Sequence, residues 1–98
     1  MDPDQGLPSV VRVTDAWEFD PTSPKSEQIA AEIERRIRNG TYPPKHPIFE
    51  VRLVQEFGVA RDTARKATAI LRERGMIFTV RGMGSFVSDP SAWEAEPQ

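Results

Sequence analysis

One stretch of the chain, residues 57–87, constrains the fold more than any other. It holds the end of a short periodic segment, a stop at Gly58, a second periodic segment that ends at Gly75, and two short apolar runs. Glycine directly after a periodic segment is typical of a helix C-terminus, because glycine adopts the left-handed conformation without steric cost. The order therefore predicts two helices joined by a tight turn and followed by a small β hairpin.

The second of these helices, expected from about Arg61 to Arg74, separates apolar from basic side chains. Its apolar positions recur at helical spacing and are Ala64, Ala67, Ile70 and Leu71. At about 100° of rotation per residue, a stripe lies roughly opposite them. The stripe is formed by Arg61, Arg65 and Arg72, flanked by Thr68 and Ala69. Such a stripe is usually a solvated face, but its place between a helical turn and a glycine-rich hairpin favours contact with DNA.

Another helix is expected at the start of the ordered region. Ser23 is expected to cap it, with Pro24 at the first helical position, where the missing N–H has no cost. Asn39 and Gly40 end it. Its buried positions at helical spacing are Ile29, Ala30, Ile33 and Ile37.

The segment between these helices contains a proline-rich connection and a short helix. Residues 41–47 hold three prolines and are expected to be a stiff connection rather than a regular element. A helix is expected over roughly residues 49–57, with Leu53, Val54 and Phe57 on its buried side.

The hairpin completes the predicted fold. Residues 76–80 and 85–87 are expected as strands joined by Arg81-Gly82-Met83-Gly84, where the glycines permit positive φ. The predicted fold class is mainly α with a small β-wing, a winged helix-turn-helix of three helices plus a two-stranded antiparallel wing.

Charge divides the chain into three parts. The net charge is −2, yet residues 25–88 carry twelve Lys and Arg against seven Asp and Glu. Because salt screens charges beyond about 8 to 10 Å, this local excess matters more for phosphate binding than the whole-chain value does. We expect an acidic leader at 1–22, a domain at 23–88 and an acidic tail at 89–98.

The two acidic ends leave alternatives open. The leader either is disordered or docks as a strand through Val10, Val11 and Val13, followed by Trp17 and Phe19. The acidic ends either solubilise the domain or fold over the basic helix and compete with DNA.

Several function classes are excluded by what the sequence lacks. It has no cysteine and one histidine, His46, which is interpreted as a loop residue; disulfides, a thiolate metal site and a histidine pair are excluded. We find no catalytic constellation, so neither an enzyme nor a cofactor is expected. No apolar run reaches the roughly 20 residues that span a bilayer, and no signal peptide is evident; a cytoplasmic protein with no membrane partner is expected.

Over about residues 19–88 the chain resembles the DNA-binding domain of the GntR family of bacterial transcriptional regulators. The resemblance is carried, in order, by Glu18-Phe19-Asp20-Pro21, by Ile37 to Tyr42, by Phe57-Gly58-Val59 with Arg61 and Thr63, by Arg65, Ala67, Leu71 and Gly75, and by Gly82 to Val87. It implies a third helix in the major groove and a wing over the minor groove. The DNA-binding residues expected on this basis are Arg52, Arg61, Asp62, Thr63, Arg65, Lys66, Arg81, Gly82, Met83 and Gly84.

The chain also departs from the family pattern. Residues 44–50 are one residue shorter than usual and lack the usual serine cap. Ala60 replaces a hydroxyl residue, and Asp62 suits the helix dipole but repels a close phosphate. Val51 stands where an arginine is common, although the adjacent Arg52 could substitute partly. We therefore expect a different base preference.

The resemblance implies a sequence-specific regulator, and a repressor rather than an activator, because occupying an operator requires no further surface. An inverted-repeat operator in double-stranded DNA and a homodimer on it are expected. Family members normally continue into an effector-binding domain, which this chain does not contain. It is either a fragment or a minimal regulator, and the composition of residues 91–98 favours the second.

The alternative function is a winged-helix module for protein binding. Its basic face would meet an acidic partner, and Trp17, Phe19 or Trp93 would supply the apolar anchor.

Overall fold

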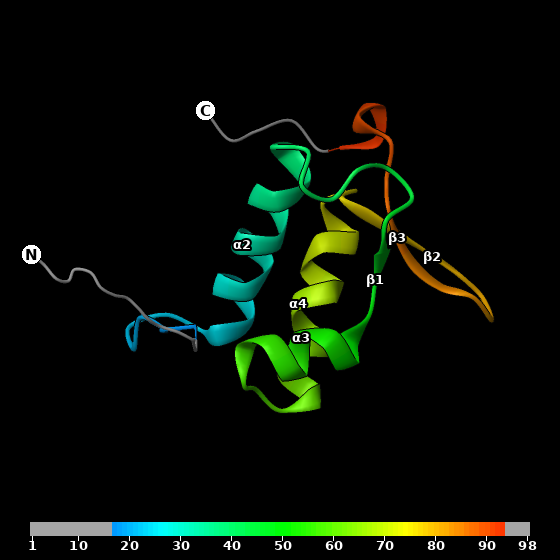
Figure 1. Ribbon diagram of the computed structural model, residues 1–98. Helices are drawn as coiled ribbons and strands as arrows, with labels where there is room; N and C mark the ends of the chain where they lie inside the picture. The colour runs from blue at the N-terminus through cyan, green and yellow to red at the C-terminus, as the bar shows by residue number, and fades with distance from the viewer. Residues whose placement is uncertain (1–16, 94–98) are drawn as a thin grey trace, which may run out of the picture.

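The computed structural model describes residues 17–93, which form three helices and a small sheet (Figure 1). The elements in order are α2 (Lys25–Arg38), β1 (Pro47–Ile48), α3 (Glu50–Phe57), α4 (Arg61–Glu73), β2 (Ile77–Val80), β3 (Gly84–Val87) and the short 3-10 helix η2 (Pro90–Ala92). The β2–β3 hairpin, residues 77–87, projects away from the helices and is called the wing below. The predicted winged helix-turn-helix is confirmed.

Helix α2 begins one residue later than expected. Pro24 is the N-cap, with an extended backbone at φ −60° and ψ 138°, and Ser23 does not cap the helix. Instead the Gln28 side chain reaches back to the lead-in: its Nε2 donates to the Asp20 carbonyl at 2.8 Å, and its Oε1 accepts from the Asp20 N–H at 2.9 Å. The expected serine cap was wrong because the extended Pro24 moves the helix start one residue on, and the Ser23 hydroxyl instead accepts from Gln28 Nε2 at 3.2 Å.

The turn between α3 and α4 matches the prediction. Gly58 has φ 64° and ψ 40°, and its N–H donates to the Val54 carbonyl at 2.9 Å. This left-handed conformation is the one that glycine adopts without strain. Phe49 before α3 and Ala60 before α4 supply no side-chain cap, as the missing hydroxyls predicted.

The sheet has a third strand that the sequence analysis missed. The strand order is β1-β3-β2, all antiparallel, and Pro47 and Ile48 pair with Phe86 and Ser85. The expected stiff connection therefore ends in a strand, and the wing is rooted in three strands rather than two. A proline is compatible with β1 because an edge strand can omit one N–H from the ladder. Two residues are too few to show a strand period.

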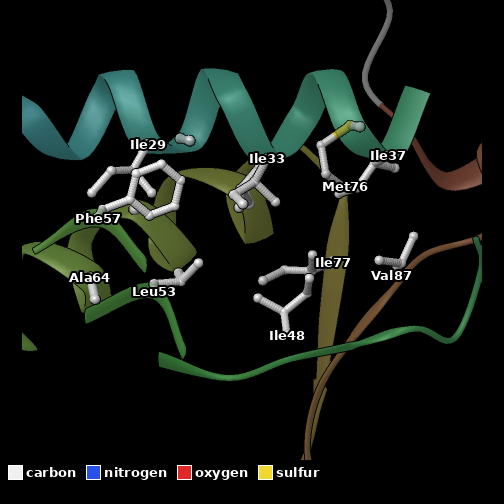
Figure 2. Close-up of a cluster of buried hydrophobic side chains, with 13 residues drawn as sticks. Ile29, Ile33, Ile37, Ile48, Leu53, Phe57, Ala64, Met76, Ile77 and Val87 are labelled. Atoms are coloured by element: carbon white, nitrogen blue, oxygen red, sulfur yellow. The ribbon is translucent and has the colours of Figure 1, made fainter. Parts of the chain in front are cut away.

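The core lies between α2, the other two helices and the root of the wing (Figure 2). The side chains of Ile29, Ile33 and Ile37 point from α2 toward α3, α4 and the sheet. The buried hydrophobic residues are Ile29, Ala30, Ile33, Ile37, Ile48, Leu53, Phe57, Ala64, Ala67, Leu71, Met76, Ile77 and Val87. Small Ala64 and Ala67 allow α4 to pack closely on its neighbours.

The ends of the described region pack onto this core. The Trp17 ring meets Phe57 edge-on, with centroids 5.2 Å apart. At the other end, a side chain at Gly75 would overlap the Ala92 carbonyl, so η2 closes directly over the joint between α4 and β2. The expected strand of Val10, Val11 and Val13 lies outside the described residues. No helix within residues 17–93 is long and apolar enough to cross a bilayer.

Candidate nucleic-acid interface

Three cations gather at the first turns of α4 and are called the basic cluster: Arg61, Arg65 and Lys66. Their side chains are 78%, 60% and 68% exposed. Asp62 lies among them, 3.6 Å from Arg65 Nη1 and 3.5 Å from Lys66 Nζ. Exposed pairs at such distances are weak in water. The cluster can therefore exchange these contacts for phosphate or base edges.

The N-terminus of α4 adds to the positive field of the basic cluster. Ala60 places no side chain over the first turn, and Thr63 is half-buried there. Because the first N–H groups of a helix have no intrahelical partner, this end attracts anions. Arg61 Nε lies 3.9 Å from Glu50 Oε1, which places the first residue of α3 beside the first residue of α4.

The third arginine of the predicted stripe does not share this environment. Arg72 Nε donates to Thr79 Oγ1 on the wing at 2.8 Å. Thr68, expected at the edge of an exposed stripe, is 2% exposed, and its hydroxyl donates to the Arg65 carbonyl at 2.8 Å. Arg61, Arg65, Ala69 and Arg72 are exposed as predicted, and only the expectation for Thr68 was wrong, because Thr68 is buried and its hydroxyl bonds back to the helix backbone.

The wing ends in an exposed turn. The Met83 N–H donates to the Val80 carbonyl at 2.9 Å, and Gly82 and Gly84 have φ of 79° and 119°. Arg81 and Met83 are exposed at this turn. Because Gly82 and Gly84 carry no side chain, the turn can approach another backbone closely.

Arg52 lies in a different setting from the basic cluster. It lines an open hollow beside α3 together with Tyr42, His46 and Phe49. The neighbouring Val51 is exposed.

His46 stacks on Tyr42, with ring centroids 4.5 Å apart. Within residues 17–93, no group of three or more His, Cys, Asp or Glu residues could hold a metal ion.

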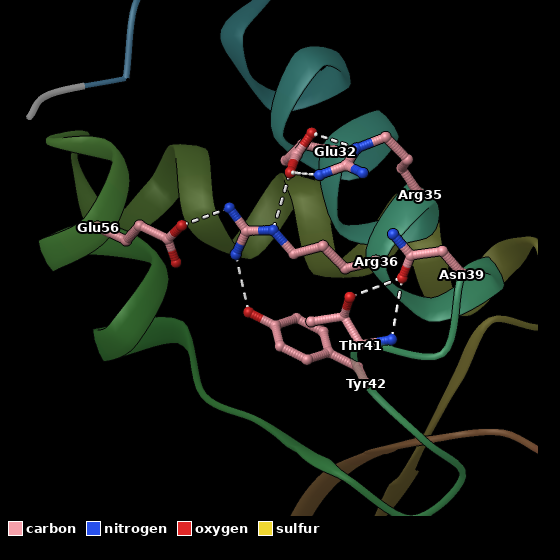
Figure 3. A network of polar contacts seen from close by, with 7 residues as sticks. All are labelled: Glu32, Arg35, Arg36, Asn39, Thr41, Tyr42 and Glu56. Atoms are coloured by element: carbon pink, nitrogen blue, oxygen red, sulfur yellow. Dashed lines mark hydrogen bonds and ion pairs between the residues drawn. The ribbon is translucent and has the colours of Figure 1, made fainter. Parts of the chain in front are cut away.

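A polar network joins α2 to α3 on another part of the domain, and the sequence analysis did not find it (Figure 3). Arg36 Nε donates to Glu32 at 2.8 Å, its Nη1 donates to the Tyr42 hydroxyl at 2.8 Å, and its Nη2 donates to Glu56. The bonds from Arg35 and Arg36 hold the pKa of Glu32 below its usual value, and Glu56 raises the pKa of Arg36. The spacing of Glu32 and Arg36 signals the local pair; nothing local signals Glu56.

The aromatic residues considered as anchors for a protein partner pack against the domain. Trp17, Phe19 and Trp93 are each partly buried on the core. Lys25 Nζ lies 5.2 Å from the Phe19 ring centre, and the Arg38 guanidinium lies 5.1 Å from that of Trp93. No observation here favours the protein-binding alternative.

Comparison with known proteins matches this geometry to one family. Residues 25–87 match the model of the gntR family of bacterial regulatory proteins. The chain is 33% identical over 69 residues to the transcriptional repressor NagR and 42% identical over 64 residues to the transcriptional regulator GmuR, both of Bacillus subtilis. These matches cover 69% and 64% of this chain but 28% and 27% of the relatives.

Solved structures agree with the sequence match. The DNA-binding domain of AraR, crystallised with its operator ORX1, shares 37% identity with a TM-score of 0.66, over 76% of this chain and 95% of that domain. A GntR family regulator from Listeria monocytogenes gives 31% and 0.68, over 74% and 65% of the two chains. The chain therefore belongs to the GntR family of bacterial regulatory proteins, and its described part is a winged-helix DNA-binding domain of that family.

Proposed function

We propose that this chain is a sequence-specific regulator of transcription, acting as a repressor in the bacterial cytoplasm. The observation that carries the proposal is the exposed basic cluster at the uncapped start of α4, in a domain similar to one crystallised with its operator. Repression is favoured because NagR is a named repressor and because operator occupancy alone can block transcription.

In this proposal α4 enters the major groove. Arg61 and Lys66 of the basic cluster contact phosphates and give a steep salt dependence. Arg65 reads guanine by a bidentate contact with O6 and N7, the commonest specific pairing. Thr63 contacts a phosphate, and Asp62 limits which phosphates approach the helix start. Arg52 supplies a further contact from α3.

The wing tip, residues 81–84, lies over the minor groove. Arg81 suits its negative potential, and Gly82 and Gly84, which carry no side chain, permit a close approach to the sugar-phosphate backbone. Met83 lies between them as an exposed apolar contact. One domain reads few base pairs, so two copies are proposed to bind an inverted repeat in double-stranded DNA as a homodimer.

The test is selection from a pool of random duplex DNA near physiological salt, followed by sequencing. The native chain is compared with R61A/R65A and with R35A/K45A, which also removes two positive charges but outside the basic cluster. Enrichment of one inverted-repeat motif by the native chain and the control, with loss in R61A/R65A, is the expected result. No enrichment by the folded native chain overturns the proposal, and an enriched motif without twofold symmetry overturns the dimer.

A further inference from the structure

We propose that Arg72 is a positioning residue that sets the angle of the wing against α4, and thereby where the wing tip meets DNA. The inference rests on the proposed DNA-binding function. It concerns an arginine that sequence reasoning grouped with Arg61 and Arg65 but that makes a different contact.

The contact is a hydrogen-bond chain that reaches both strands of the wing. Arg72 Nε donates to Thr79 Oγ1 at 2.8 Å, and Thr79 Oγ1 lies 2.9 Å from Ser85 Oγ. Thr79 and Ser85 are directly paired across β2 and β3. The Arg72 guanidinium is thus hydrogen-bonded to β2 directly and to β3 through Thr79, at one paired position of the wing. We call these linked bonds the helix–wing chain.

The helix–wing chain lies between the buried root of the wing and its exposed tip. The root of the wing is held by the core, since Met76, Ile77 and Val87 are buried. Beyond Thr79, residues 80–83 are all exposed. At about 3.3 Å per strand residue, the tip lies at most about 10 Å past the chain. A change of angle at Thr79 therefore moves the whole exposed tip.

The chemistry of arginine allows this role and a phosphate contact at once. The helix–wing chain uses Nε, whereas the guanidinium carries five N–H donors. Loss of Arg72 would remove a charge as well as the tie, so the decisive variant must break the tie and keep the charge. Thr79 offers that variant, because valine has nearly the same shape and an equal strand preference but no hydroxyl.

The experiment compares T79V with T79S on the DNA site selected by the native chain. We expect T79V, which removes both hydrogen bonds of the helix–wing chain, to weaken binding about 3- to 10-fold and to lose hydroxyl-radical protection where the tip covers the minor groove. Protection of guanine N7 in the major groove should remain. T79S, which keeps the hydroxyl, should match the native chain.

Two further variants separate positioning from direct contact. Adding R72A to T79V should lower the DNA affinity further by an amount that depends on the salt concentration. It should weaken protection evenly along the DNA site. If T79V binds and protects like the native chain while R72A weakens binding, Arg72 is a phosphate contact and the inference is overturned.

A DNA-free measurement keeps the inference testable if the proposed function fails. Residual dipolar couplings of the amides of residues 80–84, relative to those of α4, report the wing angle in the free chain. T79V should change them and T79S should not. Unchanged couplings in T79V overturn the inference whether or not the native chain selects a DNA site.

Discussion

The Arg36 network and the basic cluster are built from the same kinds of side chain but differ in burial and pairing. In the network, Arg36 is 16% exposed and bonds to Glu32, Tyr42 and Glu56. In the cluster, mostly exposed cations lie 3.5 to 3.9 Å from carboxylates. Satisfied donors hold elements together, whereas loosely paired donors stay available for a partner. Composition alone does not distinguish the two.

The largest effect is expected in the Arg36 network. R36A leaves the carboxylates of Glu32 and Glu56 without their shared cation and should lower the free energy of unfolding by about 2 to 4 kcal/mol. R35A is the control, because Arg35 also binds Glu32 but is 62% exposed; it should cost less than about 1 kcal/mol. Urea unfolding followed by circular dichroism measures both. Equal losses would show that burial does not separate these arginines.

In the basic cluster the expected effect is on binding rather than on stability. R65A should cost about 1 to 3 kcal/mol of DNA affinity and relax specificity at one base position. Affinities for a set of single-base operator variants give both quantities, with R35A as the control for loss of charge. Uniform weakening on every sequence would reduce Arg65 to a phosphate contact.

The pH dependence of stability tests how strongly the Arg36 network holds Glu32. The bonds from Arg35 and Arg36 depress the pKa of Glu32 in the folded state. Its contribution is therefore complete above the pKa of the unfolded chain and is lost as pH falls through the depressed folded value. The stability gap between the native chain and E32Q should be smaller at pH 3 than at pH 7, as measured by urea unfolding. E27Q, on the same helix, serves as the control; a gap that widens in acid would refute the assignment.

Asp62 should give the smallest effect. Because an exposed carboxylate repels nearby phosphates, D62N should raise affinity a few-fold at low salt, and the gain should fade as salt increases. Titrations at two salt concentrations measure it. A base-specific loss of affinity in D62N would instead indicate that Asp62 accepts a hydrogen bond from cytosine.

Most of the helices and the wing could be predicted from the sequence because the patterns that indicate them are local. The isoleucine repeat of α2, the left-handed Gly58 and the glycines of the wing are visible within one turn of chain. Sequence reasoning missed β1, which is two residues long, and the Arg36–Glu56 pair, whose partners are twenty residues apart. It also placed Thr68 beside the exposed stripe although Thr68 is buried, and it could not show that Arg72 bonds to the wing, since helical periodicity does not reveal contacts with a later hairpin.

The close approach at Gly75 has a practical consequence. Because Gly75 has no side chain, η2 can lie against the C-terminal end of α4. Helix α4 has 13 residues, so η2 lies about 20 Å along the helix from Arg61. A fluorophore or a surface linker attached near Ser91 would stand clear of the basic cluster. The domain could therefore be immobilised or labelled there while the exposed residues Arg61, Asp62, Arg65 and Lys66 are randomised to seek new operator preferences.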